Sequence, residues 1–413
     1  MHEGAPAVVG GAYAYKLYQG GIPTPDDGDW YLRSTKMMVD PENPDPENPD
    51  PGNPDPGNPE PPIGPLYQAG DPVYETYPQL LLGLSGLPTL QQRVGNRYWA
   101  GNGNKPISQG ADLPVLPDAP QEDYGPFIEK TGAWMRLEGS HTSIEPTLSG
   151  TQAEYDYNTF RLQAGYDALL FEDSAGTLIG GVNVQYVHGS ANISSPYNAD
   201  SGRGKIGTNG IGVGGTLTWY GSGGFYLDGQ AQATWYDSDL SIGGGRLPVA
   251  SGNDGFGYAF AIEAGQRIAL SPAWSITPQA QLTYSRVDFD DFNDAFGAAV
   301  SLEHGGKSLL GRLGISLDYE NSWQNDKGLL NRAHVYAIAN LYKEFEGSTR
   351  VNVSGVSFAS DKDDLWGGIG VGGSYNWDDD KFSVYGEALV ATSLDNFGDS
   401  YSLKGTVGLR VKW

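Results

Sequence analysis

The last thirteen residues, Tyr401 to Trp413, read YSLKGTVGLRVKW and decide the fold. Apolar and small residues alternate strictly with polar ones, and successive side chains of a β-strand point to opposite faces. One face of the expected strand carries Tyr401, Leu403, Gly405, Val407, Leu409, Val411 and Trp413. The other carries Ser402, Lys404, Thr406, Gly408, Arg410 and Lys412. The stretch therefore predicts a strand with one apolar face and one polar, cationic face.

Patterns of the same kind recur from about residue 130 to the end, separated by Gly, Asp, Asn and Ser turns. We expect strands near residues 130–141, 155–170, 177–190, 206–220, 223–237, 255–269, 273–287, 307–320, 332–345, 364–377, 381–394 and 401–413. The segment 350–358, RVNVSGVSF, is either a thirteenth strand or an extension within a long loop.

The faces and lengths of these patterns indicate a lipid solvent. In residues 225–236, FYLDGQAQATWY, an apolar row that ends at Trp235 alternates with a polar row that includes Asp228 and Gln230. The patterns exceed the roughly 9–11 residues that cross a bilayer at a tilt, whereas strands in globular proteins usually have about 5–6 residues. Because only a closed sheet satisfies its backbone in lipid, the sequence predicts an all-β fold, a 12-stranded antiparallel transmembrane β-barrel.

Composition narrows the function. The chain has 413 residues, a net charge of −25 and no cysteine, so cysteine-based metal or redox chemistry is excluded. No basic patch of useful size appears, which argues against a nucleic-acid partner. The N-terminal MHEGAPAVV lacks the basic and apolar regions of a signal peptide. If the protein is exported, we expect this chain to be a fragment or its start to be misplaced.

A proline-rich repeat precedes the strand patterns. Residues 41–62, PENPDPENPDPGNPDPGNPEPP, repeat P-x-N-P-[DE] four times, and proline excludes both helix and sheet there. An extended chain at about 3.1 Å per residue gives a spacer of roughly 65 Å. A ligand for a proline-binding module is the alternative interpretation. Before the repeat, two short strand patterns flank a turn and are too small to fold alone.

Two short helices are expected after the repeat. Pro78 and Pro88 suit the first turns of these helices, and the second helix, from about Thr89 to Tyr98, is too polar to be stable alone in water. Twelve strands close at a backbone diameter of about 24 Å, which leaves room for one helix about 10–12 Å wide. We therefore expect a pore helix in the lumen, with polar residues Thr89, Gln91, Gln92, Arg93, Asn96 and Arg97.

Strand parity predicts which charged side chains surround that helix. The expected lumen-facing set is Arg136, Glu138, Arg161, Asp228, Glu263, Arg267, Arg312, Lys404, Arg410 and Lys412. Both signs are present, so these groups can pair with one another and with Arg93 or Arg97. On the lipid face, a cation at the midplane would cost about 2–4 kcal/mol.

Motifs for catalysis and metal binding are weak. The five histidines are scattered without metal-ligand spacing. The segment VDFDDFNDAF crowds four aspartates between Asp288 and Asp294 and reads as an acidic loop; calcium is the alternative, without the glycine and distal glutamate of an EF-hand. Because no Ser–His or Asp–His set marks a rim, we expect no enzyme activity and no cofactor.

Several long motifs in order resemble one family. YQGG and GDWYLRS precede a linker, LQQRVGNR follows it, and YDYNTFRLQAGYDALL, GGFYLDGQAQATWYDSDL, PQAQLTYSRVDFDDF and LLGRLGISL lie in the barrel region. Together they resemble the C-terminal translocator of monomeric (type Va) autotransporters. The resemblance implies a passenger end with β-helix-like strands (1–40), a repeat linker (41–65), a linker with the pore helix (66–100), a connecting segment (101–129) and an outer-membrane β-barrel (130–413).

The resemblance also implies a function and partners. The barrel would export its own N-terminal passenger to the surface of a Gram-negative cell, with outer-membrane lipid, periplasmic chaperones and the barrel-assembly machinery as partners. A terminal aromatic after alternating apolar residues is similar to the signal that this machinery reads; here that signal would be Leu403, Val407, Leu409, Val411 and Trp413. Phenylalanine is the usual last residue, so Trp413 departs from the pattern.

Two other functions remain open at this point. A passive porin would need neither the polar helix nor the proline spacer, and an adhesin would use the barrel mainly as an anchor. In the branch that cleaves itself, an Asn–Asn pair precedes a motif similar to LQQRVGN, but Pro88 and Thr89 occupy those positions here. The resemblance therefore implies no self-cleavage at this site.

Overall fold

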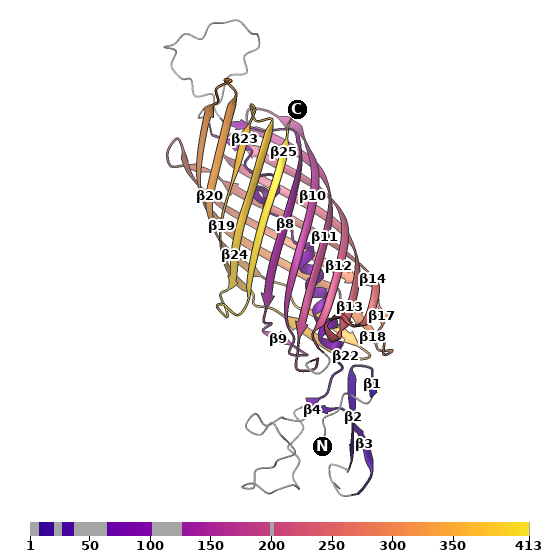
Figure 1. Ribbon diagram of the computed structural model, residues 1–413. Coiled ribbons are helices and arrows are strands. Elements are labelled where there is room, and N and C mark those ends of the chain that lie inside the picture. Colours follow the sequence, from indigo (N-terminus) through magenta and orange to yellow (C-terminus); the bar gives the residue numbers. More distant parts are fainter. Residues whose placement is uncertain (1–7, 20–26, 37–63, 101–125, 199–201, 413) are drawn as a thin grey trace, which may run out of the picture.

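A computed structural model describes residues 8–19, 27–36, 64–100, 126–198 and 202–412, and a tall antiparallel barrel dominates it (Figure 1). Its walls are β8 (Gly132–Ile144), β10 (Glu154–Glu172), β11 (Gly176–Ser194), β12 (Gly204–Gly221), β13 (Phe225–Ile242), β14 (Leu247–Gln266), β16 (Trp274–Phe289), β19 (Gly306–Gln324), β20 (Leu330–Glu344), β23 (Leu365–Trp377), β24 (Phe382–Ser393) and β25 (Tyr401–Val411). The predicted 12-stranded antiparallel barrel is confirmed.

The barrel is closed by its first and last strands. β25 pairs with β8 in an antiparallel register that runs from Tyr401 opposite Ser143 to Val411 opposite Ala133. Each of the other walls pairs with its neighbour in sequence, and the short β15 (Ile268–Ala269) only extends the ladder beside β16. The wall therefore has no free edge, which is the condition for a sheet in lipid.

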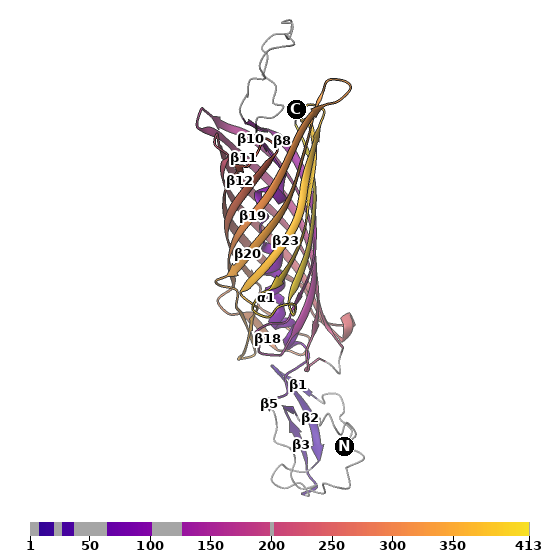
Figure 2. The same ribbon diagram turned by 90° about the vertical axis from the view of Figure 1, so that its left-hand side faces the viewer.

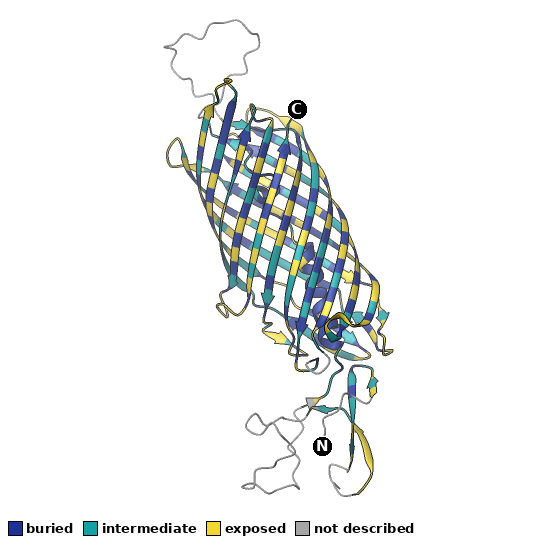
Figure 3. Ribbon diagram, viewed as in Figure 1, coloured by how far each residue is buried: buried dark blue, intermediate teal, exposed yellow. Residues whose placement is uncertain are grey.

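Side chains alternate along the walls as predicted (Figure 3). On β13, Asp228 is fully buried toward the lumen, whereas Trp235 is 54% exposed on the outer face. On β16 and β19, outward side chains run from the pair Trp274–Tyr319 to the pair Tyr284–Leu309. Ten residues of a strand tilted at about 40° span about 25 Å, the height of the apolar band in transmembrane barrels.

The two ends of the barrel differ in the length of their connections. At one end, β10 and β11 are joined by residues 173–175 and β12 and β13 by residues 222–224. At the other, residues 290–305 join β16 to β19 and residues 345–364 join β20 to β23. We call these the short-turn end and the long-loop end; the C-terminal residues of β25 lie at the short-turn end (Figure 1).

The long loops form a small sheet of their own. It contains β9 (Leu148–Ser149), β17 (Phe292–Asn293), β18 (Ala299–Leu302), β21 (Thr349–Val353) and β22 (Val356–Asp361), in the order β17-β18-β21-β22-β9. Segment 350–358 is thus part of a loop hairpin, and the thirteenth-strand alternative is wrong. The 3₁₀ turn η1 (Gly243–Gly245) connects β13 and β14.

Two helices lie inside the barrel, α1 (Asp71–Ser85) and α2 (Leu90–Val94) (Figures 1 and 2). Pro78 lies within α1 and Pro72 in its first turn, so the expected start of a helix at Pro78 is wrong. Within the described part of the chain, neither helix combines the length and the apolar character that crossing a membrane would require.

The predicted second helix is shorter than expected and ends before Asn96. Gly95 has a φ of 68° at the C-cap, and a Cβ there would lie 2.8 Å from the side chain of Tyr385. A side chain is therefore strained at position 95 both by backbone conformation and by the wall. The chain continues into β6 (Tyr98–Trp99), which pairs with β7 (Phe127–Ile128).

The N-terminal residues form a three-stranded sheet outside the long-loop end (Figure 1), from β1 (Val8–Gly10), β2 (Tyr13–Gln19) and β3 (Trp30–Arg33). β4 (Thr35–Lys36) pairs with β5 (Gly64–Pro65). The proline repeat of residues 41–62 and Trp413 lie outside the described residues.

Candidate functional site in the barrel lumen

An apolar face of α1 fills the long-loop end of the barrel. Leu80, Leu81 and Leu84 are almost fully buried and belong to a cluster that includes Val187 of β11 and Phe358 of β22. Burying one leucine contributes roughly 1.5–3 kcal/mol, while a proline within a helix costs about 3 kcal/mol or more. The three leucines together therefore offset the hydrogen bond lost at Pro78.

Arg161 on the wall caps the C-terminus of α1. Its Nη1 donates to the carbonyl of Gly86 and its Nη2 to the carbonyl of Leu84, both at 2.7 Å. The last carbonyls of a helix carry partial negative charge and have no partner within the helix. A wall cation thus satisfies them inside the lumen, where water is scarce.

An extended turn carries the chain from α1 to α2. The carbonyl of Pro88 accepts hydrogen bonds from Gln230 Nε2 (2.8 Å) and Gln281 Nε2 (3.1 Å). Thr89 and Gln92 form a capping box, in which Thr89 Oγ1 accepts from the Gln92 backbone N–H at 3.2 Å. Wall amides and a local cap therefore replace the water that this polar turn would bind if exposed.

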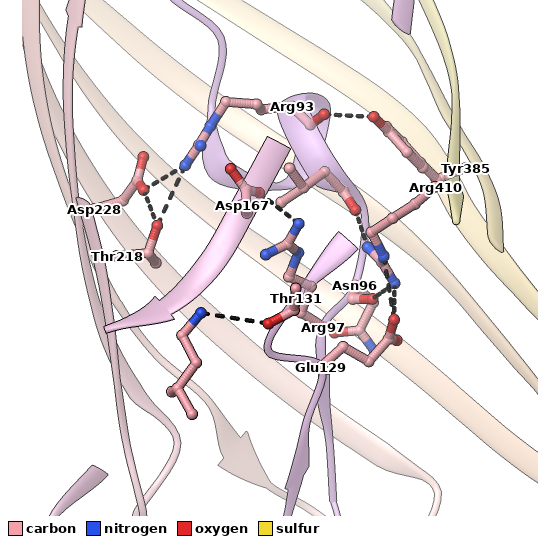
Figure 4. A network of polar contacts seen from close by, with 12 residues as sticks. Arg93, Asn96, Arg97, Glu129, Thr131, Asp167, Thr218, Asp228, Tyr385 and Arg410 are labelled. Atoms are coloured by element: carbon pink, nitrogen blue, oxygen red, sulfur yellow. Dashed lines mark hydrogen bonds and ion pairs between the residues drawn. The ribbon is translucent and has the colours of Figure 1, made fainter. Parts of the chain in front are cut away.

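Two buried ion pairs fix the chain near the short-turn end (Figure 4). Arg93 Nη2 lies 2.5 Å from Asp228 Oδ1, and Arg97 Nη2 lies 2.5 Å from Asp167 Oδ2. Thr218 Oγ1 also donates to Asp228 Oδ1. All four ionised side chains are at most 3% exposed, so each needs its partner to offset the desolvation of its charge.

Arg410 of β25 binds the backbone carbonyls at the end of α2 (Figure 4). Its guanidinium donates to the carbonyls of Val94 and Asn96 and lies 2.6 Å from Glu129 Oε2. Tyr385 OH donates to the carbonyl of Arg93 at 2.5 Å. The C-terminal carbonyls of α2 are thus satisfied by two neighbouring strands.

Side chains of β14, β19, β20 and β24 hold the other polar residues of the segment. Gln92 Nε2 donates to Glu387 Oε1 at 2.6 Å, and Asn96 Nδ2 donates to Glu320 Oε1 at 2.8 Å. Gln91 lies against His334, whose Nε2 is 2.9 Å from Asp318 Oδ1. Arg267 pairs with Glu320, and Arg312 lies 3.4 Å from Glu263 Oε2, which accepts from the Leu90 backbone N–H.

The residues singled out from sequence fall into three groups. Those buried on the lumen side are Arg136, Glu138, Arg161, Asp228, Glu263, Arg312 and Arg410. Arg267 and Lys404 are half-buried, and Lys412 lies 5.2 Å from the ring of Phe127 at the short-turn end. On the outer face of β25, Leu403, Val407 and Leu409 are exposed and Val411 is half-buried.

Sequence reasoning missed several carboxylates that hold the segment. Asp167, Glu320 and Glu387 contact Arg97, Asn96 and Gln92. Asp167 shares strand parity with Arg161, so alternation alone would have found it. Glu129 carries no such signal, because it precedes β8 and lies on no periodic strand.

Little space remains in the lumen beside the segment. A cavity of 260 Å³ lies between the turn at Thr89 and the wall at Thr283 and Arg312. Since one water takes about 30 Å³ in the liquid, this cavity holds about nine waters. The described residues include no group of three or more His, Cys, Asp or Glu side chains arranged for a metal ion.

A second polar cluster joins α1 to the loops outside the lipid band. Asp294 Oδ2 accepts hydrogen bonds from Gln68 Nε2 (3.0 Å) and Tyr74 OH (2.9 Å). Gln68 Nε2 also donates to the carbonyl of Gly11. Asp71 is buried beside them, and neither of its carboxylate oxygens has a hydrogen-bond partner among the described residues. Burial, reinforced by the charge of Asp294, holds the pKa of Asp71 well above its usual value.

We expect Asp71→Asn to stabilise the folded chain at pH 8. A raised pKa means that the folded state favours protonated Asp71, so stability is lost as pH rises through the folded pKa. The advantage of the variant should vanish below pH 3.8, the ordinary value, grow by up to about 1.4 kcal/mol per pH unit between that value and the raised pKa of the folded state, and stay constant above it. Urea unfolding in vesicles across this range is the measurement. A difference that does not change with pH would contradict the assignment.

We expect Arg93→Met to loosen the inner end of the segment, because Asp228 is then buried without its partner, at a cost of about 3–5 kcal/mol. The chain has no cysteine, so Asn96→Cys provides a unique thiol for measuring the rate of maleimide labelling. Labelling should accelerate in Arg93→Met and slow again in Arg93→Met/Asp228→Leu, which removes both charges. Equal rates in all three backgrounds would show that the ion pair does not hold the segment.

Comparison with known proteins identifies the family of this lumen and barrel. Residues 133–388 match the family described as "Autotransporter beta-domain". The chain is 44% identical over 413 residues to "Adhesin BmaC autotransporter" of Brucella suis biovar 1 (strain 1330), covering 100% of this chain and 11% of that protein. Over 151 residues it is 30% identical to "Pertactin autotransporter" of Bordetella parapertussis (strain 12822 / ATCC BAA-587 / NCTC 13253), covering 36% of this chain and 16% of that protein.

Two solved structures share the fold. The transport unit of the autotransporter AIDA-I from Escherichia coli has a TM-score of 0.60 at 17% identity, covering 84% of this chain and all of that chain. The beta domain of the Bordetella autotransporter BrkA has a TM-score of 0.51 at 23% identity, covering 69% of this chain and all of that chain. The family match over residues 133–388 spans more than half of the sequence, and the chain therefore belongs to the autotransporter β-domain family of Gram-negative outer-membrane barrels.

Proposed function

We propose that this chain is the translocator that brings its own N-terminal passenger to the cell surface and then anchors it. The segment 66–100 is the part of the chain that stays in the lumen when passage ends. The observation that carries this proposal is the path of that segment, which enters at the long-loop end and reaches the start of the barrel at the short-turn end with its polar groups paired to the wall.

The orientation follows from the connections. Outer-membrane barrels have short periplasmic turns and longer extracellular loops, so we assign the long-loop end to the cell surface. Residues 1–40 are then the end of the passenger, 41–65 a spacer, 66–100 the pore segment, 101–129 a connection and 130–413 the barrel. The small sheet of β1, β2 and β3 lies on the surface side of this arrangement.

A porin is the weaker interpretation. A passive channel needs an open path through the lumen, whereas the pore segment occupies it and the cavity of 260 Å³ beside the segment has room for about nine waters. Several charged groups of the lumen pair with the segment, as Arg93–Asp228 and Arg97–Asp167 illustrate, and others pair within the wall, as Arg136–Glu138 does.

An adhesin role for the passenger is the second candidate, favoured by the printed name of the Brucella relative. It is compatible with translocation, because a surface adhesin must stay attached. Pro88 and Thr89 cannot supply the side-chain amide that asparagine cyclisation needs, so the passenger remains joined unless a separate protease acts. We infer a non-enzymatic barrel whose partners are the passenger, outer-membrane lipid, periplasmic chaperones and the barrel-assembly machinery.

We expect the pore segment to occupy the lumen of the native protein. In Gln92→Cys/Glu387→Cys, a short bifunctional maleimide should link the two thiols, because the parent side chains meet at 2.6 Å. The matched control is Gln92→Cys/Ala388→Cys, in which the second cysteine replaces the outward neighbour of Glu387; this pair should not link.

Deleting residues 66–100 should raise single-channel conductance in planar bilayers, because the lumen then loses the segment that fills it. Equal conductance with and without the segment would revive the porin interpretation.

The outward row of β25 is our proposal for the assembly signal. We expect Val407→Asp/Leu409→Asp to lower the amount of barrel in the outer membrane far more than Ile369→Asp/Val371→Asp, an outward pair on β23 that is more exposed than Val407 and Leu409. Refolding of each variant into vesicles measures its own cost in lipid, and the losses in cells are compared after that cost is subtracted. Folded yield in cells is read by heat-modifiable mobility, and equal losses for the two variants would show that β25 carries no special signal.

A further inference from the structure

Two cations lie directly opposite each other on the outer face of the barrel. Arg286 of β16 and Lys307 of β19 are Cα partners in the antiparallel ladder. Their neighbours Ser285 and Val287 are buried toward the inside, so both charged side chains point outward. Like charges at directly opposed positions destabilise a sheet, and such a pair calls for an anion that bridges it.

No anion of the described chain does so. Among the described residues, the side chains of Arg286 and Lys307 make no hydrogen bond and no ion pair, although the whole chain has 50 acidic and 25 basic residues. The nearby Lys343, by contrast, lies 2.8 Å from Asp364. Asp288, two residues along β16, accepts from the Phe289 backbone N–H.

Two other acidic side chains of this rim are engaged elsewhere, and Glu346, which acts electrostatically on Tyr284, forms no ion pair with either cation among the described residues. Glu344 accepts from Ser308 Oγ, and Glu303 accepts from Ser357 Oγ and Asn352 Nδ2. The two cations therefore face the solvent of the outer wall without a partner from the described part of the chain.

The position of Arg286 and Lys307 along the barrel wall shows which part of the membrane surrounds them. The outward band on β16 and β19 ends at Tyr284 and Leu309, and Arg286 and Lys307 are the next outward pair toward the long loops. Tyr258 of β14 is the Cα partner of Arg286, and its ring lies 6.3 Å from that of Tyr284. Aromatic girdles mark the boundary between acyl chains and headgroups, so the cations lie at headgroup depth.

We propose that Arg286 and Lys307 bind a phosphate group of a phosphorylated glycolipid in the outer leaflet. The inference rests on the proposed orientation, with the long-loop end at the cell surface. A guanidinium binds phosphate through two parallel N–H donors, while an ammonium acts as a point charge. One phosphate between them turns a repulsive pair into two attractive contacts, and the acyl chains of the same lipid cover the apolar residues below, Leu282 and Leu309.

Native mass spectrometry of the purified 413-residue chain in detergent tests the site with diphosphoryl lipid A as the probe. Arg286→Gln/Lys307→Gln should weaken binding by about tenfold or more. The charge-conserving Arg286→Lys/Lys307→Arg should retain it, and Lys343→Gln is the matched control that should leave it unchanged. Heat-modifiable mobility verifies that each variant is folded.

Three results would overturn the proposal. If the double glutamine variant bound lipid A as tightly as the parent chain does, Arg286 and Lys307 would not form the binding site. Equal binding of dephosphorylated lipid A would assign the affinity to acyl contacts alone. Displacement of the lipid by equimolar inorganic phosphate would make the site a free-phosphate site.

Whole-cell labelling of His304→Cys, an exposed loop residue near the pair, tests the orientation separately. Absence of labelling refutes the orientation, whereas the lipid measurement tests the cation pair.

Discussion

The pairing of β25 with β8 is the constraint on which the rest of the structure depends. In lipid, an unpaired row of backbone N–H and C=O groups costs several kcal/mol per group, so a sheet of these strands is stable there only when its first and last members meet. They do so over the full register from Tyr401–Ser143 to Val411–Ala133. Closure creates a narrow lumen that is shut off from lipid, and the inward-facing side chains of the strands line it.

A closed polar lumen in turn determines what can fill it. At the short-turn end the walls supply carboxylates and arginines such as Arg410, and the pore segment supplies Arg93, Arg97 and the open carbonyls of α2. At the long-loop end the walls become apolar, and the leucine face of α1 packs there. The segment is therefore held by two kinds of interaction, hydrophobic packing at its entry and paired charges at its exit. A chain with the two halves exchanged would leave charges and leucines unmatched.

The barrel could be predicted from the sequence because, in each strand, apolar residues that face lipid alternate with residues that face the lumen. The twelve alternating patterns between about residue 130 and the end predicted the number of strands, and the alternation within stretches such as 225–236 and 401–413 predicted the direction of their side chains. The function of α1 was hidden, because LLLGLSGL is too short for a membrane helix and its packing partners, such as Phe358 and Val187, are more than a hundred residues away. Parity could place Asp228 and Arg410 in the lumen. Parity could not predict which residue of the pore segment each of them contacts, because that depends on the stagger of the strands and on the end of α2 at Gly95.

The central claim is that the barrel wall, and not the local sequence, holds α2 in its helical form. A helix of five residues is far below the roughly 12–15 that are marginal alone in water. Hydrogen–deuterium exchange of the native chain in lipid vesicles tests this most directly. The account predicts that the amides of residues 90–95 exchange as slowly as those of the barrel strands. Exchange at the rate of an unstructured peptide, with the strands still protected, would contradict it.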